Sequence, residues 1–354
     1  MRILLLGDFS GMHTHLGVGL RDLGHEVTVA SSGDGWKRLP NDISLGIDDP
    51  NIFRKIERNL KPFALINRLT GFDVVQFQNP VVFPWRFGVN AWMMRRVAAS
   101  SGRVFLSAAG DDAFFWRHAR NELGYGPFDD FLKFDLKADR YFWETERMYR
   151  WNLELVRLVR GVIPVAYEYW LGYCHCPKVS PTIPLPVDCQ ALSYEENRVT
   201  GRIRILHGLN REGFKGSRFI REALNRIEDE YRDQVEVLYV ERLRFSEYLQ
   251  TLRTCHVLVD QALSHSWGLN AILALAMGKV VLSGAEPEAL RALGIDETPV
   301  INIPPDVGRI RQIIERLIHS KETFPALGRR GREFAENLHD CRNVARRYLD
   351  AWSG

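Results

Sequence analysis

The sequence lacks any long apolar run. A membrane-spanning helix needs roughly 20 consecutive apolar residues, whereas the first run, Ile3 to Leu6, is soon interrupted by Asp8. No small-residue cleavage site follows, so the segment does not match a signal peptide. We therefore predict a cytoplasmic protein whose first segment is a buried β-strand. Peripheral contact with the inner membrane face stays open as an alternative.

Charge of one sign and cysteine are also scarce. The 354 residues carry a formal net charge of +3 with no lysine- or arginine-rich block, which argues against a nucleic-acid partner. Five cysteines are an odd number in a long chain, as is typical of a reducing compartment. Cys174 and Cys176 flank His175, but no second Cys/His pair lies at a ligand-like spacing. We expect thiols in a turn there and no metal site.

Strand and helix signals alternate along the first half of the chain. Apolar runs at 3–6, 72–77 and 103–107 are accompanied by helical stretches, the first at about 15–23 and followed by a glycine. This βαβ pattern implies a parallel, doubly wound sheet. We assign residues 1–182 to an N-terminal Rossmann-like domain.

An aromatic and charged stretch at about 114–160 interrupts this pattern. Several of its large aromatic residues recur near helical spacing, including Trp116, Phe131, Phe134, Trp143 and Trp151. One interpretation is that they pack helices on the sheet. The other is a surface for a lipid-linked or sugar acceptor, because aromatic faces stack on sugar rings and settle at membrane interfaces.

Repeated prolines then mark a domain boundary. Pro184 and Pro186 prevent regular structure at the start of a linker that we place at 183–200. The strand–helix alternation restarts over 201–330, and 331–354 is expected to be a C-terminal helix that can pack back on the N-terminal domain. The sequence predicts an α/β protein of two Rossmann-like domains facing each other across a cleft, with the ligand at the carboxyl ends of the strands.

A glycine-rich loop with two cations follows the first strand of the second domain. Arg211 and Lys215 precede Gly216 and a predicted helix start at Ser217. Glycine lets the backbone approach a ligand, a helix N-terminus favours an anion, and the two cations can neutralise a diphosphate. The alternative is a polar turn with solvated cations.

A later strand ends in Asp260-Gln261 and leads, through Gly268, into a helix of small residues that closes at Gly278. Together with the Lys215-Gly216 pair, this pattern resembles the donor-binding signature of the group 1, family 4-like glycosyltransferases. The resemblance implies the GT-B fold, with the donor site in the C-terminal domain and the acceptor side in the N-terminal domain. It implies donor-binding roles for the residues around the glycine, which are His265, Trp267, Gly268, Leu269 and Asn270.

Two positions depart from that family pattern. The family's paired glutamates in an E-x7-E arrangement correspond to His265 and Leu273, and leucine cannot accept hydrogen bonds from ribose hydroxyls. Asn270, Glu286 and Glu288 are the candidates to replace these contacts. The alternative for the last two is a structural role, since carboxylates are favourable at a helix start.

The N-terminal domain carries the predicted acceptor-side residues. The turn containing Asp111 and Asp112 resembles the family's His-Gly-x-Asp turn, and either carboxylate could orient or deprotonate an acceptor hydroxyl. Helix capping is the alternative. In the loop after the first strand, either His13 or His15 could be a general base, and the resemblance implies that Gly11 and His15 lie on the acceptor side. The alternative is a solvent-exposed histidine at a helix start.

The leading hypothesis is a retaining, metal-independent glycosyltransferase without a bound cofactor. It would move a sugar from a nucleotide-diphosphate donor of UDP or GDP type to a hydroxyl on a glycan or glycolipid, in surface glycan biosynthesis. Two alternatives stay open, a catalytically silent GT-B protein that binds a glycan or partner and a GT-B sugar-nucleotide epimerase. No metalloprotease, serine-elbow or P-loop motif competes with these hypotheses.

Overall fold

The computed structural model describes residues 1–46, 60–85, 88–128, 130, 140–211 and 213–354. Phe131 and Phe134 of the predicted aromatic stretch lie outside the described residues. Across the described part of the chain, no helix combines the length and apolar character needed to cross a membrane.

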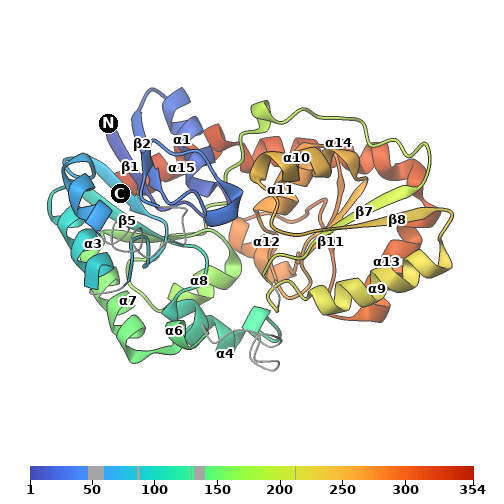
Figure 1. Ribbon diagram of the computed structural model, residues 1–354, viewed down its shortest axis with the longest axis horizontal. Coiled ribbons are helices and arrows are strands. Elements are labelled where there is room, and N and C mark those ends of the chain that lie inside the picture. Colours follow the sequence, from blue (N-terminus) through green and yellow to red (C-terminus); the bar gives the residue numbers. More distant parts are fainter. Residues whose placement is uncertain (47–59, 86–87, 129, 131–139, 212) are drawn as a thin grey trace. The chain divides into compact units, whose positions relative to one another are not determined.

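The chain divides into two compact units. Unit 1 comprises Met1–Asn121, Tyr141–Pro186 and Cys341–Gly354, and unit 2 comprises Glu122–Arg140 and Val187–Asp340. Each unit contains one β-sheet, drawn in Figure 1 with its surrounding helices. Both units are therefore assembled from segments that are distant in the sequence.

Unit 1 contains a six-stranded sheet in the order β3-β2-β1-β4-β5-β6, in which every neighbouring pair is parallel. Its strands are β1 (Arg2–Leu6), β2 (Glu26–Ser31), β3 (Ile43–Ser44), β4 (Val74–Phe77), β5 (Arg103–Ala108) and β6 (Gly161–Pro164). Its longer helices are α1 (Met12–Asp22), α3 (Val89–Ala99), α7 (Glu146–Leu158), α8 (Tyr167–Tyr173) and α15 (Cys341–Ser353), while the short α4 (Arg120–Glu122) and α6 (Arg140–Glu144) lie at the boundaries with the 122–140 segment.

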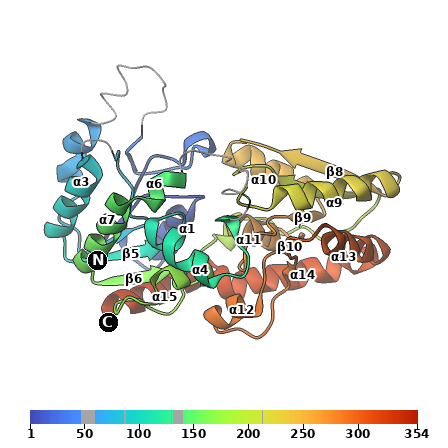
Figure 2. The same cartoon turned by 90° about the horizontal axis from the view of Figure 1, so that it is seen from below.

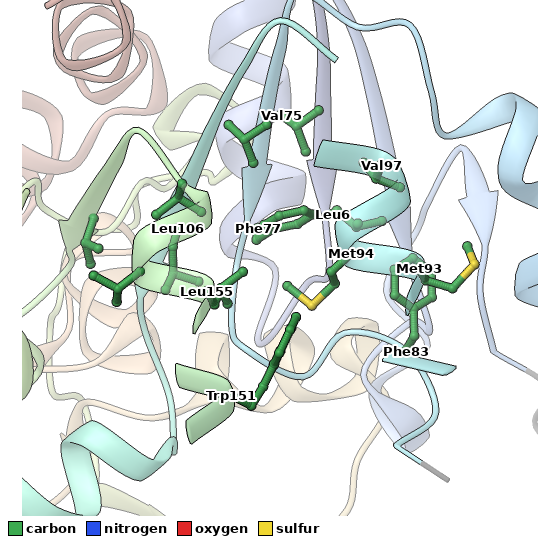
Figure 3. Packing of buried hydrophobic residues seen from close by; sticks show 14 of the residues in the cluster. Leu6, Val75, Phe77, Phe83, Met93, Met94, Val97, Leu106, Trp151 and Leu155 are labelled. Carbon is green, nitrogen blue, oxygen red and sulfur yellow. The ribbon is translucent and has the colours of Figure 1, made fainter. Parts of the chain in front are cut away.

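Buried strands and amphipathic helices build the core of unit 1. In β1, the side chains from Ile3 to Leu6 are fully buried, as expected for a parallel strand covered on both faces. Figure 3 shows Phe77 of β4 and Leu106 of β5 packed among side chains of α3 and α7, including Met94 and Trp151. Trp116 and Trp151 of the aromatic stretch are both buried, so at these two positions the stretch supplies core packing.

The C-terminal helix α15 packs against α1 within unit 1 (Figure 1). Gly19 on α1 allows this approach, because a Cβ atom at that position would lie 2.1 Å from the Cys341 carbonyl oxygen. At the other end of α15, the Trp352 indole donates a hydrogen bond to Gln76 on β4 at 2.8 Å. The last segment of the chain is thus part of the unit 1 core.

Unit 2 contains a five-stranded parallel sheet in the order β11-β10-β9-β7-β8. Its strands are β7 (Ile203–Gly208), β8 (Val235–Val240), β9 (Val257–Val259), β10 (Val280–Ser283) and β11 (Ile301–Asn302). Its helices are α9 (Ser217–Glu230), α10 (Phe245–Thr254), α11 (Leu269–Ala276), α12 (Pro287–Leu293), α13 (Val307–His319) and α14 (Phe324–Phe334).

Helices α9 and α13 lie side by side in both views of unit 2 (Figures 1 and 2). Their apolar faces bury Ile220, Leu224, Ile310 and Ile314 in one cluster with the strands, while α11 is buried along its whole length except for Asn270. Two wholly parallel α/β sheets confirm the predicted fold class. They also place the loops after the strands of each sheet at a single edge.

Candidate functional site

In unit 2, the strand order reverses beside β7. The chain passes from β7 to its neighbour β8 and then crosses to β9 on the other side of β7. The loops after β7 and β9, residues 209–216 and 260–268, therefore flank a topological switch point. Open α/β sheets bind ligands at such a point, beyond the carboxyl ends of the strands.

A buried ion pair joins these two loops. Lys215 Nζ donates to Asp260 Oδ1 at 2.7 Å, and the two side chains are only 11% and 3% exposed. Asp260 thus balances the charge of a lysine that is largely withdrawn from water. An ammonium group has three N–H donors, so the pair with Asp260 leaves Lys215 able to donate to an anion as well.

Two helix starts converge on this ion pair. Gly216 adopts a left-handed φ of 71° before α9, and a Cβ atom there would lie 3.1 Å from Leu263 of the neighbouring loop. Gly268 precedes α11, where a Cβ atom would lie 3.6 Å from Asp260 Oδ2. Since the first N–H groups of a helix have no intrahelical partner and carry partial positive charge, both helix starts favour an anion beside Lys215.

His207 at the end of β7 supports the start of α9. Its Nδ1 lies 2.7 Å from the Val259 carbonyl oxygen and its Nε2 lies 2.9 Å from Ser217 Oγ. Because a carbonyl only accepts, Nδ1 carries the proton and Nε2 accepts from the Ser217 hydroxyl. Burial, reinforced by the nearby Lys215 charge, lowers the pKa of His207 to about 4. The ring is therefore neutral at pH 7 and links β7, β9 and α9.

Arg211, the second predicted cation, lies in the same loop as Lys215. Its backbone adopts a left-handed φ of 61°, which is uncommon for a residue other than glycine. The guanidinium carbon lies 4.3 Å from the centre of the Phe214 ring, a cation–π contact that holds the side chain against its own loop. Arg211 thus stays beside the Lys215 loop at the carboxyl edge of the sheet.

Several large side chains around Gly268 face the interior of unit 2. Trp267 is 4% exposed and its indole nitrogen donates to His339 Nε2 at 3.0 Å. Leu269 is also buried, and Leu273 is fully buried within α11, whereas Asn270 is partly exposed. This segment therefore offers a ligand mainly its backbone, its helix start and the Asn270 side chain.

A second polar cluster lies where the 260–268 loop meets the end of β10. The His265 ring stacks on Tyr125, with ring centres 4.5 Å apart, and the Tyr125 hydroxyl donates to Glu286 Oε1 at 2.7 Å. Asn302 at the end of β11 donates to the same oxygen at 3.0 Å. The backbone N–H of Glu286 donates to the His265 carbonyl at 2.9 Å, so these residues form one connected group.

Glu288 has a different environment from Glu286. It lies in the first turn of α12 and accepts from Arg291 at 2.7 Å. A backbone N–H at the helix start and the Arg291 guanidinium together hold the pKa of Glu288 below its usual value. Glu288 therefore interacts mainly with its own helix, while Glu286 belongs to the Tyr125 cluster.

Unit 1 has a switch point of its own, between β1 and β4. The loop after β1 is ordered by Asp8, whose carboxylate accepts from the backbone N–H groups of His13 and Thr14, both at 3.0 Å. Gly11 has a left-handed φ of 92° before α1, and a Cβ atom there would lie 3.6 Å from His15 Cδ2. Gly11 and His15 are thus neighbours at the start of α1.

His13 is fully buried below the same loop. Its Nδ1 lies 2.6 Å from the Gly7 carbonyl oxygen, so Nδ1 is the donor and Nε2 is unprotonated. Burial lowers the pKa of His13 to about 4. The ring is neutral at pH 7, and its burial separates it from solvent in this conformation.

The two predicted aspartates lie after β5 and differ in accessibility. Asp112 is 1% exposed, and its carboxylate accepts from the Phe115 N–H and the Tyr173 hydroxyl, both at 2.8 Å. Burial raises the pKa of Asp112 to about 6. Asp111 is partly exposed, and its carbonyl accepts from Asn79 at 3.0 Å. Asp112 thus organises the turn from within, and Asp111 is the more accessible carboxylate.

Comparison with known proteins adds a structural relationship. No protein-family model and no curated protein matches the chain. The structure of sucrose-phosphate synthase from Thermosynechococcus elongatus matches with a TM-score of 0.63 at 13% identity, covering 100% of this chain and 98% of that chain. Anabaena HepE in complex with UDP and glucose matches with a TM-score of 0.64 at 13% identity, covering 100% of this chain and 99% of that chain.

A glycosyltransferase from Rickettsia africae matches with a TM-score of 0.55 at 12% identity, covering 99% of this chain and 97% of that chain. These full-length matches, together with the two parallel sheets, decide the fold. The chain has the GT-B fold. Identities this low establish the architecture of the GT-B chain alone, because one fold hosts many different activities.

The two loops at the switch point of unit 2 were among the predicted site segments of the GT-B chain, whereas Tyr125 and Asn302 were not predicted. Tyr125 lies within the aromatic stretch, between Gly124 and Gly126, and 140 residues separate it from His265. No local spacing rule connects positions that far apart. Asn302 ends a strand of two residues, which is too short to give a clear periodic signal.

Proposed function

We propose that this GT-B chain is a glycosyltransferase that takes a sugar from a nucleotide-diphosphate donor of UDP or GDP type and transfers it to a hydroxyl on a glycan or glycolipid. The observation that carries the proposal is the buried Lys215–Asp260 pair at the switch point of unit 2. HepE, which shares the fold, was solved with UDP and glucose bound.

The donor diphosphate is proposed to lie beside Lys215, at the starts of α9 and α11. Lys215 donates to a phosphate oxygen while Asp260 keeps its side chain in place, and backbone N–H groups near Gly216 and Gly268 add further donors. Breaking the bond from the anomeric carbon to the donor phosphate leaves charge on the nucleoside diphosphate. Donors that are already oriented stabilise that charge without reorganisation.

For the acceptor side, we propose Asp111 as the residue that orients or deprotonates the acceptor hydroxyl. Of the three catalytic candidates, Asp111 is the accessible one, since Asp112 and His13 are buried. Asp112 would act on Asp111 indirectly, because its hydrogen bonds to Phe115 and Tyr173 fix the turn that carries both aspartates. Gly11 and His15 would border the acceptor.

Nucleotide binding tests the donor site directly. UDP and GDP are titrated by isothermal calorimetry into the wild type, Lys215→Ala and Lys321→Ala. Lys321 is an exposed lysine of unit 2, so Lys321→Ala is the matched control. Loss of a charge-assisted hydrogen bond predicts about 10- to 100-fold weaker binding by Lys215→Ala and no change in Lys321→Ala. Equal affinity of Lys215→Ala and the wild type would refute the phosphate assignment.

One observation favours a second candidate, a GT-B protein without transferase activity that binds a glycan or partner. Leu273 is fully buried in α11, so that helix position offers no carboxylate to a ribose. Product formation separates the candidates: release of UDP or GDP from the nucleotide sugar supports the transferase. A protein that binds glycans but no nucleotide supports the second candidate.

A further inference from the structure

The polar cluster at the end of β10 contains a residue from a distant part of the sequence. Tyr125 belongs to the 122–140 segment, which is assigned to unit 2. Its ring stacks on His265 with an interplanar angle of 27°, and its carbonyl oxygen lies 3.2 Å from His265 Nε2. The same segment makes a second contact with the rest of unit 2, in which the Arg218 guanidinium donates to the buried Asp130 carboxylate at 2.7 Å.

The directions of the hydrogen bonds determine what this cluster can bind. The Tyr125 hydroxyl and the Asn302 amide both donate to Oε1 of Glu286. With the phenol proton committed to Oε1, the phenol oxygen can only accept from a ligand, and Oε2 of Glu286 is also an acceptor. Tyr125 and Glu286 together present acceptors, which suit hydroxyl groups and repel a carboxylate or phosphate.

The position of the cluster relates it to the ion pair. Asp260 begins the 260–268 loop, and His265 on the same loop accepts from the backbone of Glu286 at 2.9 Å. Gly284 fixes this contact, because a Cβ atom there would lie 1.9 Å from the Ser264 carbonyl oxygen. The ion pair and the Tyr125–Glu286 cluster are thus connected through one loop, along which a donor with its phosphates at Lys215 would extend.

We infer that Tyr125 and Glu286 determine donor specificity by accepting hydrogen bonds from hydroxyl groups of an uncharged donor sugar. This inference rests on the proposed function, because it needs the diphosphate at Lys215. The aromatic ring of Tyr125 adds an apolar surface beside the sugar ring, and Asn302 orients the Glu286 carboxylate. A uronic acid sugar would bring a second carboxylate beside Glu286 and bind more weakly.

Three ligands and three variants test the inference by isothermal titration. The ligands are UDP, UDP-glucose and UDP-glucuronate, or GDP, GDP-mannose and GDP-mannuronate where the wild type prefers guanine. Tyr125→Phe keeps the ring and removes only the hydroxyl. It should leave the Kd of the nucleoside diphosphate unchanged and weaken the neutral nucleotide sugar about 3- to 10-fold, as expected for the loss of one hydrogen bond.

Glu286→Gln removes the negative charge. It should therefore lower the ratio between the Kd of the uronate nucleotide and the Kd of the neutral nucleotide sugar. Tyr231→Phe is the matched control. Tyr231 follows the last residue of α9, whereas Gly216 precedes the first one, so this variant should bind all three ligands like the wild type. If Tyr125→Phe weakens the binding of the nucleoside diphosphate and of the nucleotide sugar equally, Tyr125 contacts the nucleoside and the inference is wrong. The inference is also wrong if the wild type binds the uronate nucleotide more tightly than the neutral nucleotide sugar.

The same titrations separate the inference from the proposed function. A wild-type protein that binds neither UDP nor GDP refutes the nucleotide site itself. A wild-type protein that binds both the nucleoside diphosphate and its sugar, with no change in Tyr125→Phe, leaves the nucleotide site intact and refutes the role of Tyr125.

Discussion

Replacing Lys215 by methionine removes the cation of the buried pair but keeps an unbranched side chain of similar length. Asp260, whose side chain is 3% exposed and whose Oδ1 accepts from Lys215 at 2.7 Å, then stays in place without its counter-charge. Removing one partner of such a pair typically costs about 3–5 kcal/mol, because the remaining charge is left buried and uncompensated.

The double variant Lys215→Met/Asp260→Asn shows whether this reasoning holds. It removes both charges while keeping the shapes of the side chains, so most of the stability lost in Lys215→Met should return. Urea unfolding of the wild type, both single variants and the double variant gives the coupling free energy. Lys321→Met, an exposed lysine of the same unit, controls for the loss of a lysine.

A small effect of Lys215→Met would refute the burial argument. If it lowers the free energy of unfolding by less than about 1 kcal/mol, the pair behaves as a solvated surface pair. If the double variant is no more stable than Lys215→Met, the unpaired charge of Asp260 is not the cause of the loss.

Three further predictions concern packing and pH. Gly19→Ala should destabilise the protein by about 1–3 kcal/mol in urea unfolding, since its Cβ atom would lie 2.1 Å from the Cys341 carbonyl oxygen; an unchanged midpoint would contradict the α1–α15 packing. His207 has its pKa lowered to about 4, so the unfolded state takes up a proton first and stability falls from about pH 6.5 towards pH 4. His207→Gln should reduce this loss in the free energy of unfolding between pH 6.5 and pH 4 by up to about 3 kcal/mol. An unchanged dependence of stability on pH would contradict a neutral His207. Gly284→Ala, which would bring a Cβ atom to 1.9 Å from the Ser264 carbonyl oxygen, should weaken nucleotide-sugar binding by displacing the 260–268 loop, and wild-type affinity would contradict this.

The regular elements could be predicted well where their patterns are long. The apolar runs at 3–6 and 103–107 correspond to β1 and β5, and the helix start predicted at Ser217 is the first residue of α9. Hydrophobic periodicity did not predict β3 and β11, because these strands have only two residues each. Short edge strands form because a longer neighbour supplies their hydrogen bonds, and this neighbour is not apparent in a local sequence window.

The candidate site divides in the same way. Gly216 and Gly268 were recognisable because they stand directly before predicted helices, and Lys215 because it precedes one of them. The burial of Trp267 against His339 could not be predicted, since the indole could equally have faced a ligand. Only the packing of the last part of unit 2 determines its direction.

By itself, the sequence determined the order of strands and helices, and thereby two parallel α/β sheets, because hydrophobic periodicity and glycine positions are local properties. The tertiary structure decided which side chains are accessible and which distant residues meet. It buried Asp112 and left Asp111 partly exposed, and it brought Tyr125 onto His265 and Glu286. Such contacts join residues that lie more than a hundred positions apart in the chain. Local sequence patterns do not determine them, because they depend on the path of the whole chain between the two residues.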